Sequence, residues 1–199
     1  MDCSMCILAP KMIECAHHPN VQLLGYSELK DVKGSVGNFT VKVLKKPRYV
    51  DETKCTGCGI CSEHCPSEVP NEFDMNFGMR KAIYMPFPQA VPRVMTVDKE
   101  NCINCGLCEK VCGAQAVDLE ERAEEVELEV GSVILATGFD LFDPSKLPAY
   151  GYGRYKDVIT SLELERLLCA SGPTGGHLVR PSDGKIPKSV AFIQCVGSR

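Results

Sequence analysis

The 199-residue chain lacks several features that would settle its class at once. No stretch approaches the roughly 18 consecutive apolar residues of a membrane helix, so we expect no membrane span. The opening residues, MDCSMCILAP, have neither a basic flank nor a small-residue cleavage site, which argues against a signal peptide. An excess of positive charge is also missing. The formal net charge of −4 argues against nonspecific attraction to nucleic acid or to an anionic membrane.

Cysteine, by contrast, is abundant, with 13 residues in the chain. Disulfide scaffolds use cysteine at this density, but they belong to short secreted chains. Here the thiols are clustered at metal-ligand spacing in a sequence without an export signal. We therefore expect reduced cysteines in a cytoplasmic protein. The hydrophobic fraction of 44% is sufficient for a real core, so wholesale disorder is not expected.

Eight of the cysteines form two copies of one spacing. The stretch CTGCGICSEHCP, from Cys55 to Pro66, follows C-x2-C-x2-C-x3-C-P, and CINCGLCEKVCG repeats it from Cys102 with Gly113 in place of proline. This is the spacing of bacterial two-cluster ferredoxins. Two-residue gaps in a tight loop let three thiolates converge on one cubane, and Gly57 suits the bends of such a loop, as does the next glycine. We expect the fourth cysteine of each run to open a short helix leading to the other cluster.

In two-cluster ferredoxins the fourth cysteine of each run binds the cluster of the other run. Zinc is the alternative, because CxxC pairs also make tetrahedral sites, but zinc leaves the repeated x2-x2-x3 phase unexplained. The sequence therefore predicts two [4Fe–4S] clusters. The predicted ligands are Cys55, Cys58, Cys61 and Cys112 for cluster I, and Cys102, Cys105, Cys108 and Cys65 for cluster II.

Two segments that flank the cysteine runs alternate between apolar and polar residues. FTVKVLKK places Val41 and Val43 on one face, and EEVELEV places Val126 and Leu128 on one face with glutamates on the other. We expect these segments to be the arms of one antiparallel hairpin, because Lys42 could then lie opposite the glutamates. The glutamate-rich stretch is interpreted as a solvated strand face.

The cluster domain is predicted to be inserted at the tip of this hairpin, where long insertions are tolerated. NVQLLGYSELKDV is predicted to form a further strand, and SVILATG, a continuous apolar run after Gly131, a strand buried on both faces. The Pro-rich segment 67–101 is expected to pack on its own domain rather than to dock a partner. The sequence thus predicts an α+β fold with domains at 1–46, 47–119 and 120–199.

Outside the two runs, the remaining predictions concern helices and single cysteines. SLELERLLCA is typical of an amphipathic helix capped by Thr160 or Ser161, with Leu167 on its buried face. Cys15 and Cys169 lie on apolar stretches with helical spacing, so we expect both to be small core residues.

The N-terminal stretch holds a CxxC pair, Cys3 and Cys6. A redox pair beside a flavin and two thiols at a frayed terminus are both compatible with it. His17 and His18, which precede Pro19, are expected to end a short helix rather than to bind metal.

Longer motifs carry a family resemblance. KKPRYVDETKCTGCG, MRKAIYMPFPQAVP, LATGFDLFDPSKLPAYGYGRY and KSVAFIQCVGSR make the chain similar to the middle of the flavin and iron–sulfur subunits of heterodisulfide reductase, a family of methanogens and related anaerobes. The strands followed by VILATGF also resemble the flavin domain of thioredoxin-reductase-like oxidoreductases. The resemblance covers nearly the whole sequence.

The resemblance implies single-electron transfer between FAD and [4Fe–4S] clusters within an oxidoreductase complex. Implied partners are other heterodisulfide-reductase-type subunits, an electron-donating hydrogenase or dehydrogenase, and ferredoxin. Thr137 and Gly138 would approach the flavin, and Cys195 would join later cysteines of the family in a further cluster. No catalytic residue and no thiol–disulfide active site is expected in this chain.

The sequence departs from the family in lacking a G-x-G-x-x-G motif after an opening strand, so its flavin site is expected to be incomplete. We accordingly interpret the chain as a fragment or truncated product of an incomplete FAD domain, not catalytically complete alone. Two alternatives stay open. One is a stand-alone ferredoxin-like carrier without flavin, and the other is a quinone-linked relative from the same family.

Overall fold

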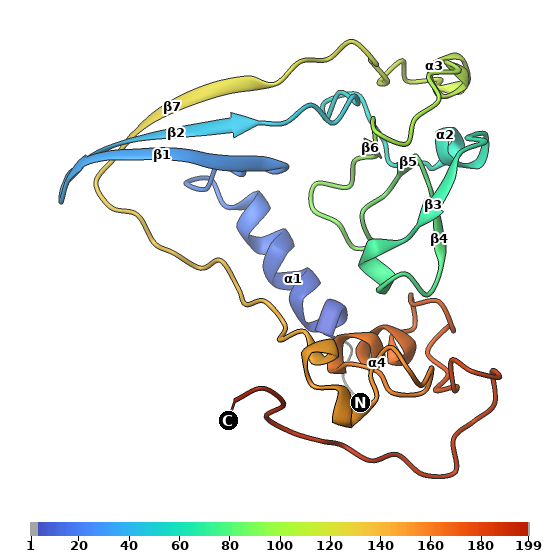
Figure 1. The fold of residues 1–199 in the computed structure, drawn as a ribbon. Helices are drawn as coiled ribbons and strands as arrows, with labels where there is room; N and C mark the ends of the chain where they lie inside the picture. Colours follow the sequence, from blue (N-terminus) through green and yellow to red (C-terminus); the bar gives the residue numbers. More distant parts are fainter. Residues whose placement is uncertain (1–3, 199) are drawn as a thin grey trace. The chain divides into compact units, whose positions relative to one another are not determined.

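The computed structural model describes residues 4–198, and they form two compact units (Figure 1). The first, here called the N-terminal unit, comprises the residues up to Pro70 together with Met79–Leu135, and it contains both cysteine runs. The second, the C-terminal unit, comprises Asn71–Gly78 and the residues from Ala136 onward. A short piece of chain between the two cysteine runs therefore belongs to the C-terminal unit. None of the helices in the described range is long and apolar enough to cross a membrane.

The N-terminal unit begins with helix α1, Ser4–His17. The helix ends at His17, as predicted. The expectation that Cys15 is a core residue is wrong, because its side chain is exposed, and so are Ile7 and Ile13. Apolar residues at helical spacing define a face that could be buried, but they do not supply the partner that buries it.

A three-stranded antiparallel sheet follows, in the order β1-β2-β7, made of Ser27–Ser35, Asn38–Lys45 and Glu124–Val130. The predicted pairing of the two alternating segments is confirmed, since β2 and β7 run antiparallel with Lys42 opposite Glu127. Lys42 Nζ lies 3.5 Å from Glu127 Oε2, and the glutamates of β7 are exposed. The upstream strand is shorter than predicted, because it begins only at Ser27.

The connection from β2 to β7 carries both cysteine runs and a small core of its own. Its elements are α2 (Ile60–Glu63), β3 (Glu68–Pro70), β4 (Met79–Lys81), β5 (Ile83–Tyr84), β6 (Thr96–Val97) and α3 (Leu107–Val111), with β3 paired to β4 and β5 to β6.

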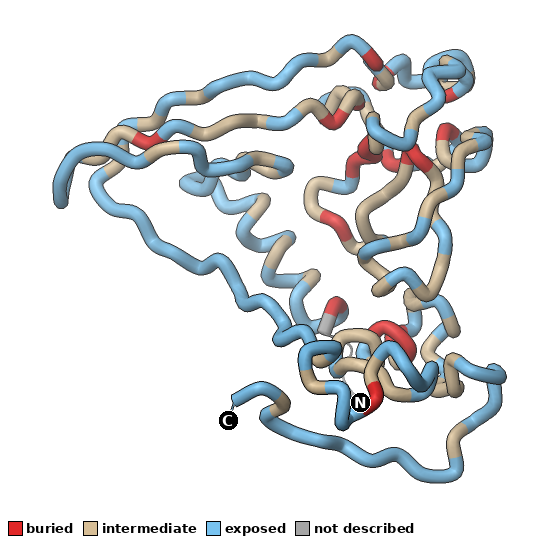
Figure 2. Tube along the Cα trace, viewed as in Figure 1, coloured by how far each residue is buried: buried red, intermediate tan, exposed pale blue. Residues whose placement is uncertain are grey.

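The core of this connection gathers around β5 and β6 (Figure 2). Its central side chains are Val50, Ile83 and Val94, each 2% exposed, and Val50 also forms a bridge with Val117. The expectation that the Pro-rich segment packs on its own domain is confirmed for the part from Met79 onward, because Ile83, Val94, Met95 and Val97 of that part belong to this core. The core therefore depends on residues inserted between the two cysteine runs.

The apolar run after Gly131 does not form the predicted buried strand. Residues 131–142 have no regular structure, and Ile134 and Leu135 are 90% and 77% exposed. A β-strand needs a hydrogen-bonding neighbour, and no strand within residues 4–198 pairs with this segment. Apolar composition alone is therefore insufficient to make it a strand.

The C-terminal unit is built from short 3-10 turns and one helix. The turns are η1 (Glu72–Asp74), η2 (Pro144–Lys146) and η3 (Pro148–Tyr150), and the helix is α4, Ser161–Leu168. Thr160 is the N-cap, as predicted, and forms a reciprocal capping box with Glu163. Leu167 and Cys169 are 3% and 5% exposed, so the predicted burial of both is confirmed.

One buried ion pair joins η1 to α4 within this unit. Arg166 Nη2 and Nε donate to Asp74 Oδ1 over 2.9 and 3.0 Å, and the guanidinium lies 4.5 Å from the ring centroid of Phe73. The two charged side chains are only 7% and 13% exposed. The pair links the segment Asn71–Gly78 to α4 within the unit. Breaking it would be costly, because removing one member of a buried pair leaves the other charge without compensation.

We expect Arg166→Gln to lower the free energy of unfolding by about 3 kcal/mol, because it strands the Asp74 carboxylate in a buried site. Urea denaturation followed by circular dichroism measures the change. The matched control is Arg180→Gln, since the pair of Arg180 with Asp183 is 41% and 34% exposed and should contribute less than about 1 kcal/mol. Equal effects of the two substitutions would contradict the role given to the buried pair.

Candidate metal centres

Each cysteine run folds as a loop with two residues in the left-handed backbone region. In the first run these are Gly57 and Gly59, with φ of 65° and 85°, and in the second Asn104 and Gly106, with φ of 52° and 68°. At Gly57 an added Cβ would lie 2.8 Å from the carbonyl oxygen of Arg93, so only glycine fits there. Sequence reasoning missed Asn104, although asparagine is the non-glycine residue that best tolerates this conformation.

The second left-handed residue of each loop is a glycine that starts a short helix. Gly59 caps α2 and Gly106 caps α3, so the helix begins just after the second cysteine of the run and contains the third. The fourth cysteine follows the helix, and Cys112 is the C-cap of α3. The expectation that the fourth cysteine opens a helix is therefore wrong. The left-handed glycine after the second cysteine starts the helix, and the helix ends before the fourth cysteine.

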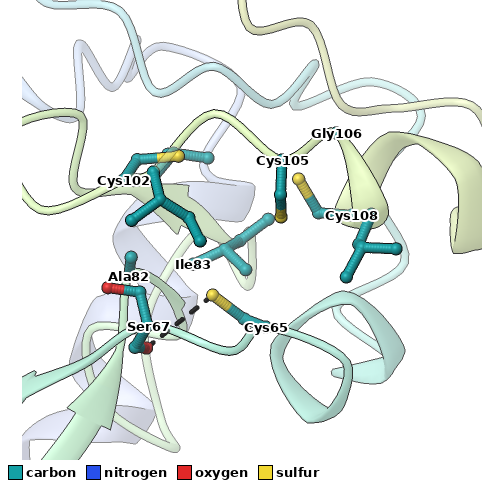
Figure 3. A pocket seen from close by; sticks show the side chains of 11 residues that line it. Cys65, Ser67, Ala82, Ile83, Cys102, Cys105, Gly106 and Cys108 are labelled. Atoms are coloured by element: carbon teal, nitrogen blue, oxygen red, sulfur yellow. Dashed lines mark hydrogen bonds between the residues drawn. The ribbon is translucent and has the colours of Figure 1, made fainter.

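Two pockets collect the eight cysteines in two groups of four. Each pocket takes three cysteines from one run and the fourth cysteine from the other run. Pocket I is lined by Cys55, Cys58, Cys61 and Cys112, and pocket II by Cys65, Cys102, Cys105 and Cys108. In pocket II the sulfur atoms of Cys65, Cys105 and Cys108 point into the same space (Figure 3).

The remaining walls of the pockets are mostly apolar. Val50 and Met95 line pocket I, and Ile83, Val97 and Leu107 line pocket II. The lining residues found within the described part of the chain include no lysine or arginine. Negative charge on four thiolates therefore has to be balanced by a bound cation or by backbone dipoles.

Backbone amides are directed at the first sulfur of each loop. Gly57 N lies 3.4 Å from Cys55 Sγ, and Asn104 N lies 3.4 Å from Cys102 Sγ. The two contacts occupy equivalent positions in the two runs, so the repeated sequence forms the same hydrogen bond twice. Amide donors of this kind stabilise thiolate ligands and tune the metal that they hold.

Buried and exposed cysteines of a run differ in the pKa of their thiols. Burial raises the pKa of Cys61 to about 11, and burial also raises the pKa of Cys108, the third cysteine of the second run. At the exposed Cys58, a hydrogen bond from the amide of Ile60 lowers the pKa of the thiol. Metal binding must therefore displace a proton from the buried thiols.

The donor set fits iron–sulfur clusters. All eight candidate ligands are cysteines, they divide four and four, and soft thiolates are the ligands that such clusters use. The pockets also supply amides directed at sulfur and apolar walls, which are the features that set cluster stability.

The other residues singled out in the sequence lie elsewhere. Thr137 and Gly138 sit in the irregular segment 131–142, where Gly138 has φ of 76° and no atom within 4 Å of an added Cβ. Cys195 and Cys6 are exposed and line neither pocket, while Cys3 lies outside the described residues. The open surface at Thr137 and Gly138 does not fit a complete flavin site, which needs a cradle for the pyrophosphate as well.

Comparison with known proteins finds sequence matches both for the cysteine-rich region and for the whole chain. Residues 54–117 match the 4Fe-4S dicluster domain. The whole chain is similar to one of the iron–sulfur A-subunits of CoB–CoM heterodisulfide reductase from Methanopyrus kandleri, with 67% identity over 198 residues. Over its whole length the chain is thus similar to the iron–sulfur A-subunits of heterodisulfide reductase. The family resemblance predicted from the sequence motifs is thereby confirmed, and so is the ferredoxin-like dicluster domain.

Two further A-subunits of heterodisulfide reductases are similar to the chain. Identity is 58% over 199 residues with the A-subunit of the H2:CoB-CoM heterodisulfide,ferredoxin reductase of Methanothermobacter thermautotrophicus. It is 55% over 199 residues with the A-subunit of the ferredoxin:CoB-CoM heterodisulfide reductase of Methanosarcina mazei. The matches cover 100% of this chain, but the chain spans only 30% of the first two relatives and 25% of the third.

Proposed function

We propose that this chain is an electron-transfer module of a heterodisulfide-reductase-type complex and holds two [4Fe–4S] clusters. The observation that carries the proposal is the composition of the two pockets. Each joins three cysteines of one run to the fourth of the other, which is the ligand crossing of two-cluster ferredoxins. Pocket I would hold one cluster on Cys55, Cys58, Cys61 and Cys112. Pocket II would hold the other on Cys102, Cys105, Cys108 and Cys65.

Each cluster, when bound, can accept and release a single electron. The residues of the chain hold and shield it. The loop amides of Gly57 and Asn104 donate towards sulfur, and the core side chains keep water from the inner faces. Helices α2 and α3 contact each other, which keeps the two pockets adjacent. Electrons can then pass from one pocket to the next without a diffusing carrier.

The second cysteine of each run lies at the solvent-exposed edge of its pocket. Cys58 and Cys105 are exposed, whereas the third cysteines, Cys61 and Cys108, are buried. We assign electron exchange with partners to these exposed edges. The relatives' names mention H2, ferredoxin and the CoB-CoM heterodisulfide. By analogy, the proposed partners are other heterodisulfide-reductase subunits, ferredoxin, and an electron-donating hydrogenase or dehydrogenase in a cytoplasmic complex.

For the longer family protein we propose an FAD site that includes Thr137 and Gly138. The dicluster domain would then be an insertion in the β2–β7 hairpin of a flavin domain, with 1–46 and 120–199 contributed by the host. A stand-alone carrier without flavin and a quinone-linked relative are the alternatives. Oxidoreductase activity would belong to the assembled complex, since this chain would supply an electron-transfer path rather than a thiol–disulfide active site.

Metal analysis of the anaerobically prepared chain tests the proposal. We expect about eight irons and eight acid-labile sulfides per chain, because two cubanes contain four of each. The measurement combines iron and sulfide determination with the broad visible absorbance of sulfide-bridged iron. Stoichiometric zinc without sulfide would contradict the proposal and support a zinc-binding structural module.

The crossed ligation is tested by comparing alanine variants of single cysteines. We expect Cys112→Ala to leave the same paramagnetic resonance spectrum as Cys58→Ala, because both remove a ligand from pocket I. Cys105→Ala should leave the complementary spectrum. Cys15→Ala is the control, since Cys15 is exposed on α1 and lines neither pocket. A Cys112→Ala spectrum matching Cys105→Ala would overturn the crossed assignment.

Flavin binding separates the module from a stand-alone carrier. We expect the isolated chain to bind FAD weakly or not at all, because Thr137 and Gly138 supply only part of a site. Co-expression with a family segment that carries a glycine-rich pyrophosphate loop should produce stoichiometric FAD, measured by absorbance after gel filtration. If that segment does not produce flavin binding, the stand-alone carrier becomes the better description. Tight FAD in the isolated chain would contradict the incomplete-site assignment.

A further inference from the structure

A buried ion pair lies close to the second cysteine run, in the N-terminal unit. Arg80 Nη2 is 2.9 Å from Asp98 Oδ2, and the two side chains are 8% and 14% exposed. The Arg80 guanidinium also stacks on the ring of Tyr84, 4.0 Å from its centroid. Arg80 lies 18 residues before Asp98 in the chain, so the ion pair anchors Asp98 to a distant part of the segment between the two runs.

Asp98 in turn fixes the turn that delivers the first cysteine of the second run. Its Oδ1 accepts the backbone N–H of Asn101 over 3.3 Å, and its Oδ2 accepts the side-chain amide of Asn101 over 2.9 Å. Asn101 immediately precedes Cys102. The position of Cys102 therefore depends on a carboxylate that is itself anchored by Arg80.

Ser67 extends this network to the crossing cysteine of pocket II. The Ser67 hydroxyl donates to the carbonyl oxygen of Asn101 over 2.7 Å, and the Ser67 carbonyl accepts the N–H of Ala82 over 3.2 Å. The Cys65 thiol lies 3.8 Å from the same carbonyl (Figure 3). One continuous set of hydrogen bonds thus connects the residue before Cys102 with the residue two places after Cys65.

The internal repeat supplies a direct comparison with pocket I. Aligning Cys55 with Cys102 places Asp51, Lys54 and Ala114 at the positions of Asp98, Asn101 and Ser67. The backbone link is present at both pockets, since Asp51 N donates to Ala116 O and Asp98 N to Ala82 O, each over 2.7 Å. The side-chain link is not, because alanine has no hydroxyl.

The carboxylates at the two equivalent positions also differ. The side chain of Asp51 is 34% exposed and makes its side-chain contacts with the nearby Thr53 and Lys54. Asp98, by contrast, binds the buried guanidinium of Arg80, which lies 18 residues earlier in the chain. The network is therefore specific to pocket II.

We propose that Arg80, Asp98, Asn101 and Ser67 are positioning residues that hold the crossing ligand Cys65 beside Cys102, so that pocket II retains its cluster more firmly than pocket I. The inference rests on the cluster ligation proposed above. Three ligands of each cluster are set by one local loop, but the fourth comes from the other run and depends on tertiary contacts. At pocket II those contacts include the side-chain link from Ser67 to Asn101, whereas at pocket I the equivalent positions are joined by the backbone hydrogen bond from Asp51 to Ala116.

The test uses the full chain with both clusters, treated anaerobically with an iron chelator while paramagnetic resonance follows each cluster separately. The cysteine variants described above identify which signal belongs to which pocket. Ser67→Ala should speed the loss of the pocket II signal about fivefold, the factor equivalent to ~1 kcal/mol for one hydrogen bond. The pocket I signal should decay at its original rate. Ser67→Thr, which keeps the hydroxyl, should restore the slow loss.

Ala114→Ser is the matched control at the equivalent position of pocket I, and it should leave the pocket II rate unchanged. Arg80→Lys is a milder second variant, since it keeps the charge but loses the planar contact with Tyr84, and it should also act on pocket II selectively. Equal acceleration of both signals, or no acceleration by Ser67→Ala, would overturn the inference. A wild-type chain without clusters would instead overturn the proposed function, before any variant is compared.

Discussion

The arrangement depends on one constraint: each group of four cysteines takes its fourth member from the other run. Three sulfurs can be brought together by a single loop with two left-handed residues and a short helix. The fourth sulfur can reach them only if the two loops face each other, which requires α2 and α3 to pack together. The local repeat and the tertiary fold are therefore inseparable at this site, because neither loop completes a pocket alone.

The two ends of the connection between β2 and β7 help to bring the two cysteine runs together. The hairpin brings residues 46 and 123 to the same end of a sheet, and the bridge between Val50 and Val117 continues the pairing towards the cysteines. Ile83 and Val94, from the segment between the runs, then fill the space beneath the pockets. A segment that would be a short linker in a minimal two-loop protein supplies a large part of the core here.

Several features of the fold and of the site were predictable because they depend on short-range geometry. The grouping of cysteines follows from a repeated spacing, the β2–β7 pairing from period-two alternation, and the Thr160 cap from residue type at a helix start. The left-handed Asn104 was not predicted because asparagine adopts many other conformations, so its residue type alone does not indicate a positive φ. The buried strand expected after Gly131 was wrong because composition cannot supply a pairing partner.

The order of residues is enough to specify the number and spacing of the sulfurs, the alternation that pairs β2 with β7, and the resemblance to heterodisulfide reductase A-subunits. Each of these is encoded within a few residues, where backbone geometry leaves few choices. Three contacts became visible only in the folded chain: Arg80 anchors Asp98, Ser67 reaches Asn101, and Asn71–Gly78 joins α4 through Asp74 and Arg166. Those contacts join residues far apart in the chain, and the long-range approach of two segments depends on how the whole core packs.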